Sequence, residues 1–169
     1  MNVVAKFEKV SFGQFLKDCM EQFPLDDDDI VKEQYDQIEL PKRSTIGSAG
    51  YDFYSPFRTL VIYPGGSVII PTGIRCKIED GWFLGIVPRS SLGFKYHVAL
   101  ANTIGIIDSS YYIANNEGHI MVKLVNNGDR RLEIYLGDRF AQGIFLPYGI
   151  TEDDEVSALR TGGLGSTGL

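Results

Sequence analysis

Two short segments of the chain combine an arginine with hydroxyl side chains, which suits them to binding phosphate oxygens. In the first segment, Arg89 is followed directly by Ser90 and Ser91. A guanidinium fork, two hydroxyls and successive backbone N–H groups all donate hydrogen bonds that a phosphate accepts. Taken alone, Arg89 could equally be a turn residue in a surface salt bridge.

The second segment lies at the end of the chain, where Arg160 precedes four glycines and the hydroxyls of Ser166 and Thr167. Because glycine has no Cβ, such a backbone can approach a ligand closely. The segment lacks the lysine of a Walker A sequence and is therefore not that motif. The alternative for this segment alone is a disordered tail.

Two aspartates are candidates for catalysis and metal binding. Asp108 follows the apolar run 104–107, and a carboxylate at the end of a buried strand can act as a general base toward water. The alternative is an aspartate that caps a turn. Asp52, in the segment 49–52, also has two interpretations: it forms a hydrogen bond within a turn, or it contacts a metal-bound water.

The elements that must position these residues are mostly strands. From Leu40 onward, short alternating apolar runs are separated by turn signals such as Pro64-Gly65-Gly66 and Asp80-Gly81. Many short strands at this spacing predict a sandwich or barrel rather than βαβ units. The runs are Val68 and Ile70; Ile74, Cys76 and Ile78; Trp82, Leu84 and Ile86; Ile120, Val122 and Leu124; and Leu132, Ile134 and Leu136.

The first 38 residues predict helices instead. Ser11 and Gln14 form a capping box, and apolar residues then recur at helical spacing until Pro24. The acidic run 26–29 fits the start of a second helix better than a metal site, because adjacent carboxylates do not converge on one point. We expect a helical extension over 1–38, a β domain over 39–156 and a flexible glycine-rich arm over 157–169.

Composition and charge limit the class of protein. The 169 residues, 44% hydrophobic and 22% charged, fit one globular domain with a short appendage. No apolar run approaches the ~18 residues of a membrane span, and no signal peptide is evident, so we expect a cytoplasmic protein without a membrane partner. A net charge of −6 argues against a nucleic-acid partner. Cys19 and Cys76, without a CxxC pair, predict buried free thiols.

Five segments, in this order and spacing, resemble the trimeric dUTPase family. The similarity covers about 40–169. The segments are Ala49-Gly50-Tyr51-Asp52, Pro88-Arg89-Ser90-Ser91-Leu92-Gly93, Asn102 to Tyr111, Gly137 to Gly143, and Arg160 to Gly168. The resemblance implies an all-β, jelly-roll-like β-barrel and a homotrimer in which the fifth segment closes over a neighbour's pocket.

The resemblance also implies a reaction, namely hydrolysis of dUTP to dUMP and pyrophosphate. Such an enzyme limits uracil incorporation into DNA and supplies dUMP for dTMP synthesis. Asp108 would activate the water that attacks the α-phosphorus, Tyr111 would pack beneath the deoxyribose, and Asn102 would read the uracil. Mg²⁺ is the implied cofactor, with Asp52 as an outer-shell partner through water. The implied substrate-binding residues are Arg89, Ser90, Ser91, Asn102, Gly105, Tyr111, Gln142, Arg160, Leu164, Gly165, Ser166 and Thr167.

The chain departs from the family pattern at three places. Leu164 replaces the aromatic residue that lies over the uracil, and Ser110 stands where an aspartate is common. The third departure is an insertion, residues 112–117. His119 follows this insertion, and we interpret it as a structural rather than a catalytic histidine.

Two alternative functions remain at this stage. A dCTP deaminase shares several of these segments, but Lys123 stands where we would place its catalytic glutamate, and a lysine cannot be a carboxylate base. A non-catalytic binding module is disfavoured because Asp108, Arg89 and Arg160 are all present.

Overall fold

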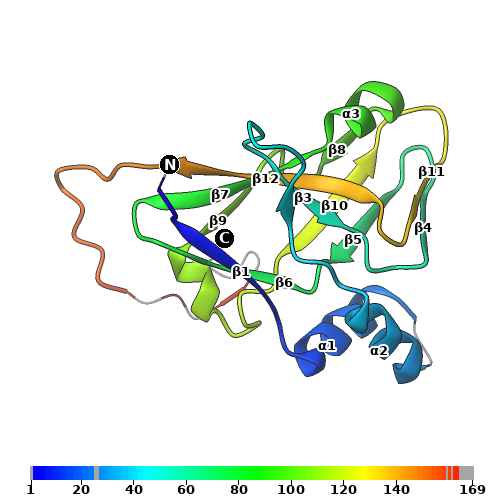
Figure 1. The fold of residues 1–169 in the computed structure, drawn as a ribbon, viewed down its shortest axis with the longest axis horizontal. Coiled ribbons are helices and arrows are strands. Elements are labelled where there is room, and N and C mark those ends of the chain that lie inside the picture. Colours follow the sequence, from blue (N-terminus) through cyan, green and yellow to red (C-terminus); the bar gives the residue numbers. More distant parts are fainter. Residues whose placement is uncertain (1, 25–26, 159, 161, 164–169) are drawn as a thin grey trace.

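The computed structural model describes residues 2–24, 27–158, 160 and 162–163, most of which lie in or between β-strands (Figure 1). The helices are α1 (Phe12–Gln22), α2 (Asp28–Asp36) and α3 (Ser90–Tyr96), with a 3₁₀ helix η1 (Ser109–Ile113). The strands are β1 (Ala5–Lys9), β2 (Lys42–Arg43), β3 (Tyr51–Tyr54), β4 (Thr59–Ile62), β5 (Ser67–Pro71), β6 (Ile74–Ile78), β7 (Trp82–Pro88), β8 (Val98–Leu100), β9 (Gly105–Asp108), β10 (Met121–Asn126), β11 (Leu132–Tyr135) and β12 (Arg139–Pro147).

A five-stranded antiparallel sheet of order β2-β3-β12-β7-β9 carries four of the residues that we predicted to be functional, namely Asp52, Gly105, Asp108 and Gln142. β7 lies between β12 and β9 and pairs with both. Its interior residues Leu84, Gly85 and Ile86 are buried, as expected for a strand that is covered on both faces. The position of each site residue therefore follows from its register against β7.

Smaller sheets complete the β domain, in the orders β5-β10-β8, β11-β4 and β1-β6. Their strands alternate as predicted, for example in β10, where Val122 and Leu124 are buried and Lys123 is exposed. The predicted all-β class is confirmed. The described strands form separate sheets rather than one closed barrel.

The N-terminal extension contains the two predicted helices. The Ser11 hydroxyl accepts a hydrogen bond from the Gln14 N–H at 3.1 Å, which confirms the predicted start of α1. The second bond of the predicted capping box is not formed, because the Ser11 N–H donates to Glu117 and the Gln14 side chain donates to Asp18. Asp27 caps α2 in the same way at 2.9 Å. Sequence patterns did not predict β1, because its residues carry one large apolar side chain among charges, and only pairing with β6 reveals it.

The extension packs into the same core as the β domain (Figure 1). Phe15 of α1 is fully buried, with ring centroids 5.7 Å from Tyr35 and 6.3 Å from Phe57. Cys19 and Cys76 are buried free cysteines, as predicted. Burial raises the pKa of both thiols to about 12, so both stay protonated at neutral pH.

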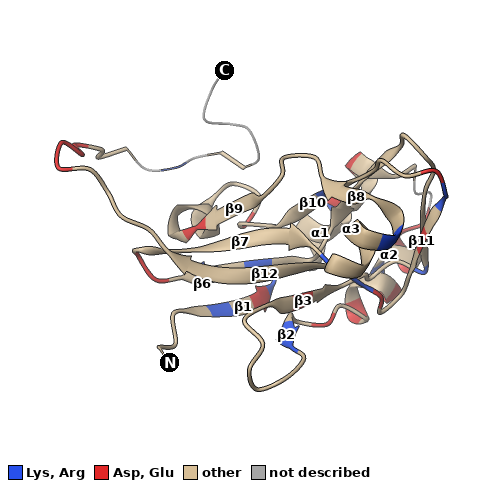
Figure 2. Cartoon of the chain, turned by 90° about the horizontal axis from the view of Figure 1, so that it is seen from above, with Lys and Arg blue, Asp and Glu red and all other residues tan. Residues whose placement is uncertain are grey.

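After β12 the chain leaves the sheet in an irregular segment, coloured orange to red in Figure 1. Its acidic residues 152–155 mark the tip of a loop that projects away from the sheet (Figure 2). Much of the predicted arm, including 164–169, lies outside the described residues. Across the described part of the chain, no helix is long and apolar enough to cross a bilayer.

Phe15→Ala should lower the free energy of unfolding by about 3–5 kcal/mol, because it removes a buried ring and leaves a cavity between the extension and the β domain. Met20→Ala is the matched control on the same helix, since Met20 is 52% exposed and should change stability by less than about 0.5 kcal/mol. Urea denaturation measures both. Equal, small effects would mean that α1 does not belong to the core.

Candidate active site

The register of the five-stranded sheet places the predicted catalytic residues at opposite ends of β7. Asp108 pairs with Phe83 at the start of β7, whereas Arg89 directly follows the end of that strand. Arg89 lies six positions after Phe83, and at 3.3 Å per residue this corresponds to a distance of about 20 Å along the strand. The side chains of Asp108 and Arg89 therefore cannot act on one bond within a single chain.

At the Arg89 end, two guanidinium groups converge on Asp52. The Arg89 Nε lies 3.3 Å from Asp52 Oδ1, and Arg139 Nη1 lies 3.3 Å from Oδ2. The Ser44 hydroxyl also donates a hydrogen bond to Oδ2, at 2.7 Å. Asp52 is buried, so this network fixes both arginines at the end of β3. Sequence reasoning assigned no role to Arg139.

The bonds around Asp52 bear on its predicted role near a metal ion. Both hydrogen bonds go to Oδ2, whereas Oδ1 forms the ion pair with Arg89 and keeps acceptor capacity for a water. A water-mediated contact with a metal therefore fits this geometry. Among the described residues, no group of three or more His, Cys, Asp and Glu side chains could hold a metal ion.

A cavity of about 260 Å³ opens beside the two arginines. Ser90 and Ser91 begin α3 next to it, and Arg89 is the N-cap of this helix. Sequence patterns did not predict α3, because its seven residues are too few to show helical periodicity. The lining residues are Arg89, Leu92, Tyr96, Leu132, Glu133, Ile134, Asp138 and Arg139.

Gln142 belongs to the same end of the sheet. On β12 it pairs with Val87 on one side and with Asp52 on the other. Its side chain fills the space beside Gly50, where a Cβ would lie only 2.6 Å from Gln142 Oε1. A larger residue at position 50 would therefore force the end of the Gln142 side chain to move.

At the other end of the sheet, Asp108 is both a helix cap and a candidate base. Its Oδ1 accepts hydrogen bonds from the Ser110 N–H at 3.1 Å and from the Ser110 hydroxyl at 2.6 Å. No described residue donates to Oδ2, which therefore keeps its lone pairs. Both sequence interpretations of Asp108, capping and availability to a water, are compatible with this geometry. Ser110 supplies a hydrogen bond in place of the charge of the more common aspartate.

Tyr111 is buried in η1, three residues beyond Asp108. Its hydroxyl donates to the His119 carbonyl at 2.8 Å and accepts from Asn116 Nδ2 at 2.9 Å. Burial raises the pKa of Tyr111, and this outweighs the opposing effects of Asn116 and of the Arg160 charge. The hydroxyl therefore stays protonated and remains a donor.

Arg160 lies against this end of the site, with its guanidinium carbon 4.9 Å from the centroid of the Tyr111 ring. Attraction between a cation and a ring face explains the contact. The contact is within one chain, whereas the resemblance predicts closure over a neighbour's pocket. Arg160 also donates to the carbonyls of Gly162 and Gly163. The predicted contacts of Leu164, Gly165, Ser166 and Thr167 lie outside the described residues.

The predicted uracil-reading residues form the tight turn that leads into β9. Asn102 is exposed, and its carbonyl accepts a hydrogen bond from the Ile104 N–H at 2.7 Å. Thr103 between them has a φ of 65°. Gly105 begins β9 and pairs with Ile86 of β7, so the turn that contains Asn102 lies toward the Arg89 end of β7 and not beside Asp108.

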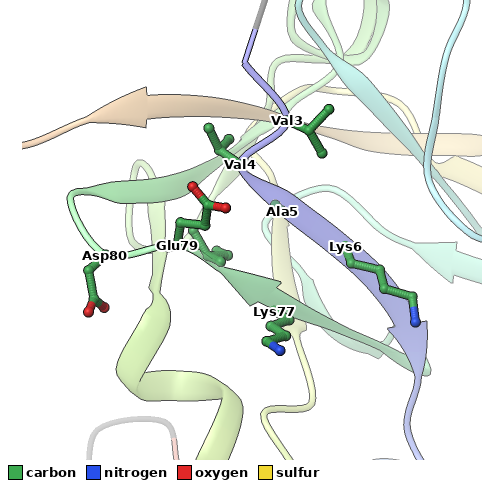
Figure 3. Close-up of a pocket in the computed structure, with 8 residues that line it drawn as sticks. Val3, Val4, Ala5, Lys6, Lys77, Glu79 and Asp80 are labelled. Carbon is green, nitrogen blue, oxygen red and sulfur yellow. The ribbon is translucent and has the colours of Figure 1, made fainter.

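A separate groove of about 480 Å³ runs along β1 and the end of β6 (Figure 3). None of the predicted site residues lines it, so it does not belong to the candidate site. Its lining residues are Val3, Val4, Ala5, Lys6, Lys77, Ile78, Glu79 and Asp80.

Comparison with known proteins identifies the family. The dUTPase family model matches residues 36–168, which is most of the chain. The chain belongs to the dUTPase family. A deoxyuridine 5'-triphosphate nucleotidohydrolase from Lactococcus lactis is 39% identical over 142 residues, covering 82% of this chain and 94% of that protein.

Solved dUTPase structures share the fold. The dUTPase from Streptococcus mutans is 30% identical, with a TM-score of 0.63, covering 86% of this chain and 98% of that one. A mutant dUTPase from phage phi11 of S. aureus, described with a structural Mg(II) ion, is 20% identical with a TM-score of 0.62. That comparison covers 93% of this chain and 98% of the phage protein.

Two parts of the chain lie outside the common dUTPase pattern, and the structure joins them. The family match begins at residue 36, so β1 and α1 precede it. Glu117 of the insertion accepts two hydrogen bonds from Ser11, from the N–H and the hydroxyl, both at 2.7 Å. His119 is fully buried, which is compatible with a structural interpretation of this residue.

Asp52→Asn should lower the free energy of unfolding by about 1–3 kcal/mol, because Arg89 and Arg139 lose their shared carboxylate while the volume is kept. Glu152→Gln, an exposed change in the segment after β12, is the control and should have no effect. Chemical denaturation measures both. Unchanged stability in Asp52→Asn would show that this network does not hold the arginines.

Proposed function

We propose that the chain hydrolyses dUTP to dUMP and pyrophosphate, as the names of its relatives imply. The observation that carries the proposal is the position of Asp108. It ends a strand, has one carboxylate oxygen fixed by Ser110 and the other without a described partner, within a chain that matches the dUTPase family.

Asp108 is the proposed general base. With Oδ1 held by Ser110, its Oδ2 accepts a proton from a water whose oxygen bonds to the α-phosphorus. The bond between the α-phosphorus and the bridging oxygen breaks, and pyrophosphate leaves with that oxygen. A base positioned in this way contributes a rate factor of about 10² to 10⁴.

Charge neutralisation is the task proposed for the opposite end of the sheet. Hydrolysis of a triphosphate depends mainly on positioning and on electrostatic stabilisation of its oxygens. Arg89 and the Ser90 and Ser91 hydroxyls supply donors beside the 260 Å³ cavity, and Gln142 adds an amide. Arg160, with Gly165, Ser166 and Thr167, is proposed to close over the phosphates, and Leu164 over the uracil.

We propose Mg²⁺ as the cofactor, held by the triphosphate and by waters. Mg²⁺ prefers oxygen ligands and keeps several waters, and it offsets part of the phosphate charge. Asp52 would contact it through one water, which its remaining acceptor position allows. The Mg(II) ion of the phage phi11 enzyme supports this choice.

The remaining proposals concern assembly and location. Because about 20 Å separates the two ends of β7, we propose that each active site combines Arg89 of one subunit with Asp108 and Tyr111 of another. The family resemblance makes the assembly a homotrimer. We propose that the enzyme acts in the cytoplasm, with an extension over 1–38, a β domain over 39–156 and an arm over 157–169.

Asp108→Asn should reduce dUTP hydrolysis by about 10² to 10⁴ while binding of a non-hydrolysable dUTP analogue changes little, because the amide keeps the shape but not the base. Asp129→Asn is the control, since that side chain is 94% exposed in a turn. Pyrophosphate release and calorimetry measure the two quantities. Near wild-type turnover in Asp108→Asn would refute the assignment.

Pyrophosphate release from dUTP, dTTP, dCTP and UTP, compared with Mg²⁺ present, tests the substrate itself. We expect dUTP to be strongly preferred. Lys123 is exposed on β10, so no carboxylate occupies the position predicted for a deaminase base, and no ammonia should be released from dCTP. Ammonia release would contradict the proposal.

A further inference from the structure

The loop that follows Tyr111 is anchored to the N-terminal extension by a buried histidine. His119 is fully buried, and its Nε2 accepts a hydrogen bond from the Gly73 N–H at 2.7 Å. Because a backbone N–H can only donate, Nε2 must be unprotonated, and the ring proton resides on Nδ1. Nδ1 contacts Oδ2 of Asp18 on α1, so the ring donates to this carboxylate.

Asp18 is itself held in place within α1. Gln14 Nε2 donates to the same Oδ2 at 2.8 Å, one helical turn away. Burial would raise the pKa of Asp18, but the hydrogen bonds from His119 and Gln14 outweigh it and lower that pKa. The carboxylate is therefore ionised at neutral pH and acts as an acceptor for both donors.

The same histidine residue holds Tyr111 through its backbone. The His119 carbonyl accepts the Tyr111 hydroxyl, and Asn116 of the insertion bonds both groups, at 2.9 Å to the hydroxyl and 3.3 Å to the carbonyl. His119 thus accepts a hydrogen bond from Tyr111 with its backbone carbonyl and donates one to Asp18 from its ring. A displacement of the His119 backbone would therefore also move the acceptor of the Tyr111 hydroxyl.

Further bonds join the insertion to the extension. Glu117 accepts two hydrogen bonds from Ser11, and the Tyr112 hydroxyl donates to Glu8 Oε2 at 2.7 Å. The Arg75 guanidinium stacks on the Tyr112 ring at 3.8 Å. The first hydrogen bond to Glu117, from the Ser11 N–H, is the main cause of a lowered pKa of that carboxyl. The insertion is therefore fixed at several points on β1 and α1.

We propose that Asp18 is a positioning residue for sugar selection, which it exerts through His119 on Tyr111. The inference rests on the proposed function and on the place beneath the deoxyribose that the family resemblance implies for Tyr111. The extension and the insertion would then together fix the position of Tyr111 in the sugar pocket. Neither part needs to touch the substrate to affect the discrimination between dUTP and UTP.

The test compares kcat and KM for dUTP and UTP in wild type and in Asp18→Asn. This substitution keeps an acceptor oxygen but removes the carboxylate charge that strengthens the hydrogen bond from His119, so the ratio of kcat/KM for dUTP over UTP should fall by about tenfold. Glu21→Gln is the control, because it removes one charge from an exposed position of the same helix. It should leave the ratio unchanged.

A double-mutant cycle with Tyr111→Phe separates positioning from general destabilisation. Each variant changes the logarithm of the kcat/KM ratio for dUTP over UTP by a measured amount. If Asp18 acts through the Tyr111 hydroxyl, the change in the double variant differs from the sum of the two single changes, whereas independent effects add. If Asp18→Asn does not fold, Glu117→Gln takes its place, and a fall in the ratio supports the inference.

Two failures can be told apart. A wild-type chain that does not hydrolyse dUTP refutes the proposed function. The wild type could instead hydrolyse dUTP and reject UTP while a folded Asp18→Asn variant keeps the same ratio of kcat/KM for dUTP over UTP. That result would overturn only the role of Asp18. Additive effects in the cycle also overturn it.

Discussion

The antiparallel pairing of β7 with β12 and β9 is the constraint on which the site depends. It places Asp52, Arg89 and Gln142 at one end of the sheet. The same pairing puts Asp108 beside Phe83 at the other end. Since the strand backbone sets a separation of about 20 Å, no side-chain rotation brings the two groups together. The two groups of residues are therefore two half-sites in our proposal, which a second copy of the chain would bring together.

Each half-site is fixed by its own interactions. Arg89 and Arg139 both form ion pairs with Asp52. The shared carboxylate offsets the repulsion between the two guanidinium groups and so holds this half-site together. The half that contains Asp108 is fixed by Ser110 and by the bonds from Tyr111 to His119. The N-terminal extension contributes hydrogen bonds to this second half, through Asp18 and Ser11. The two departures from the family pattern thus support each other.

Local patterns in the sequence predicted local structure well. The capping box at Ser11 located α1, and the alternation around Val122 located β10. The five dUTPase-like segments named the family, which the comparisons confirmed. The expectation of a single barrel was less accurate, because the described strands form separate sheets.

The contacts that the sequence did not predict join residues far apart in the chain. Arg139 meets Asp52 across 87 positions, and His119 meets Asp18 across 101. No periodicity relates such residues, so neither pair could be inferred before the fold was known. β1 and α3 were missed for a related reason. They are short, and pairing or packing rather than pattern stabilises them.

The central claim is that each active site is shared between subunits, and mixing two inactive variants tests it most directly. Arg89→Ala and Asp108→Asn are refolded together in equal amounts, and dUTP hydrolysis is measured. With random assembly, both positions of a site are intact in about one quarter of sites, so about a quarter of wild-type activity should return. A mixture of Arg89→Ala with Gln142→Ala, which affect the same half-site, should stay inactive. No recovery in the first mixture would contradict the shared site.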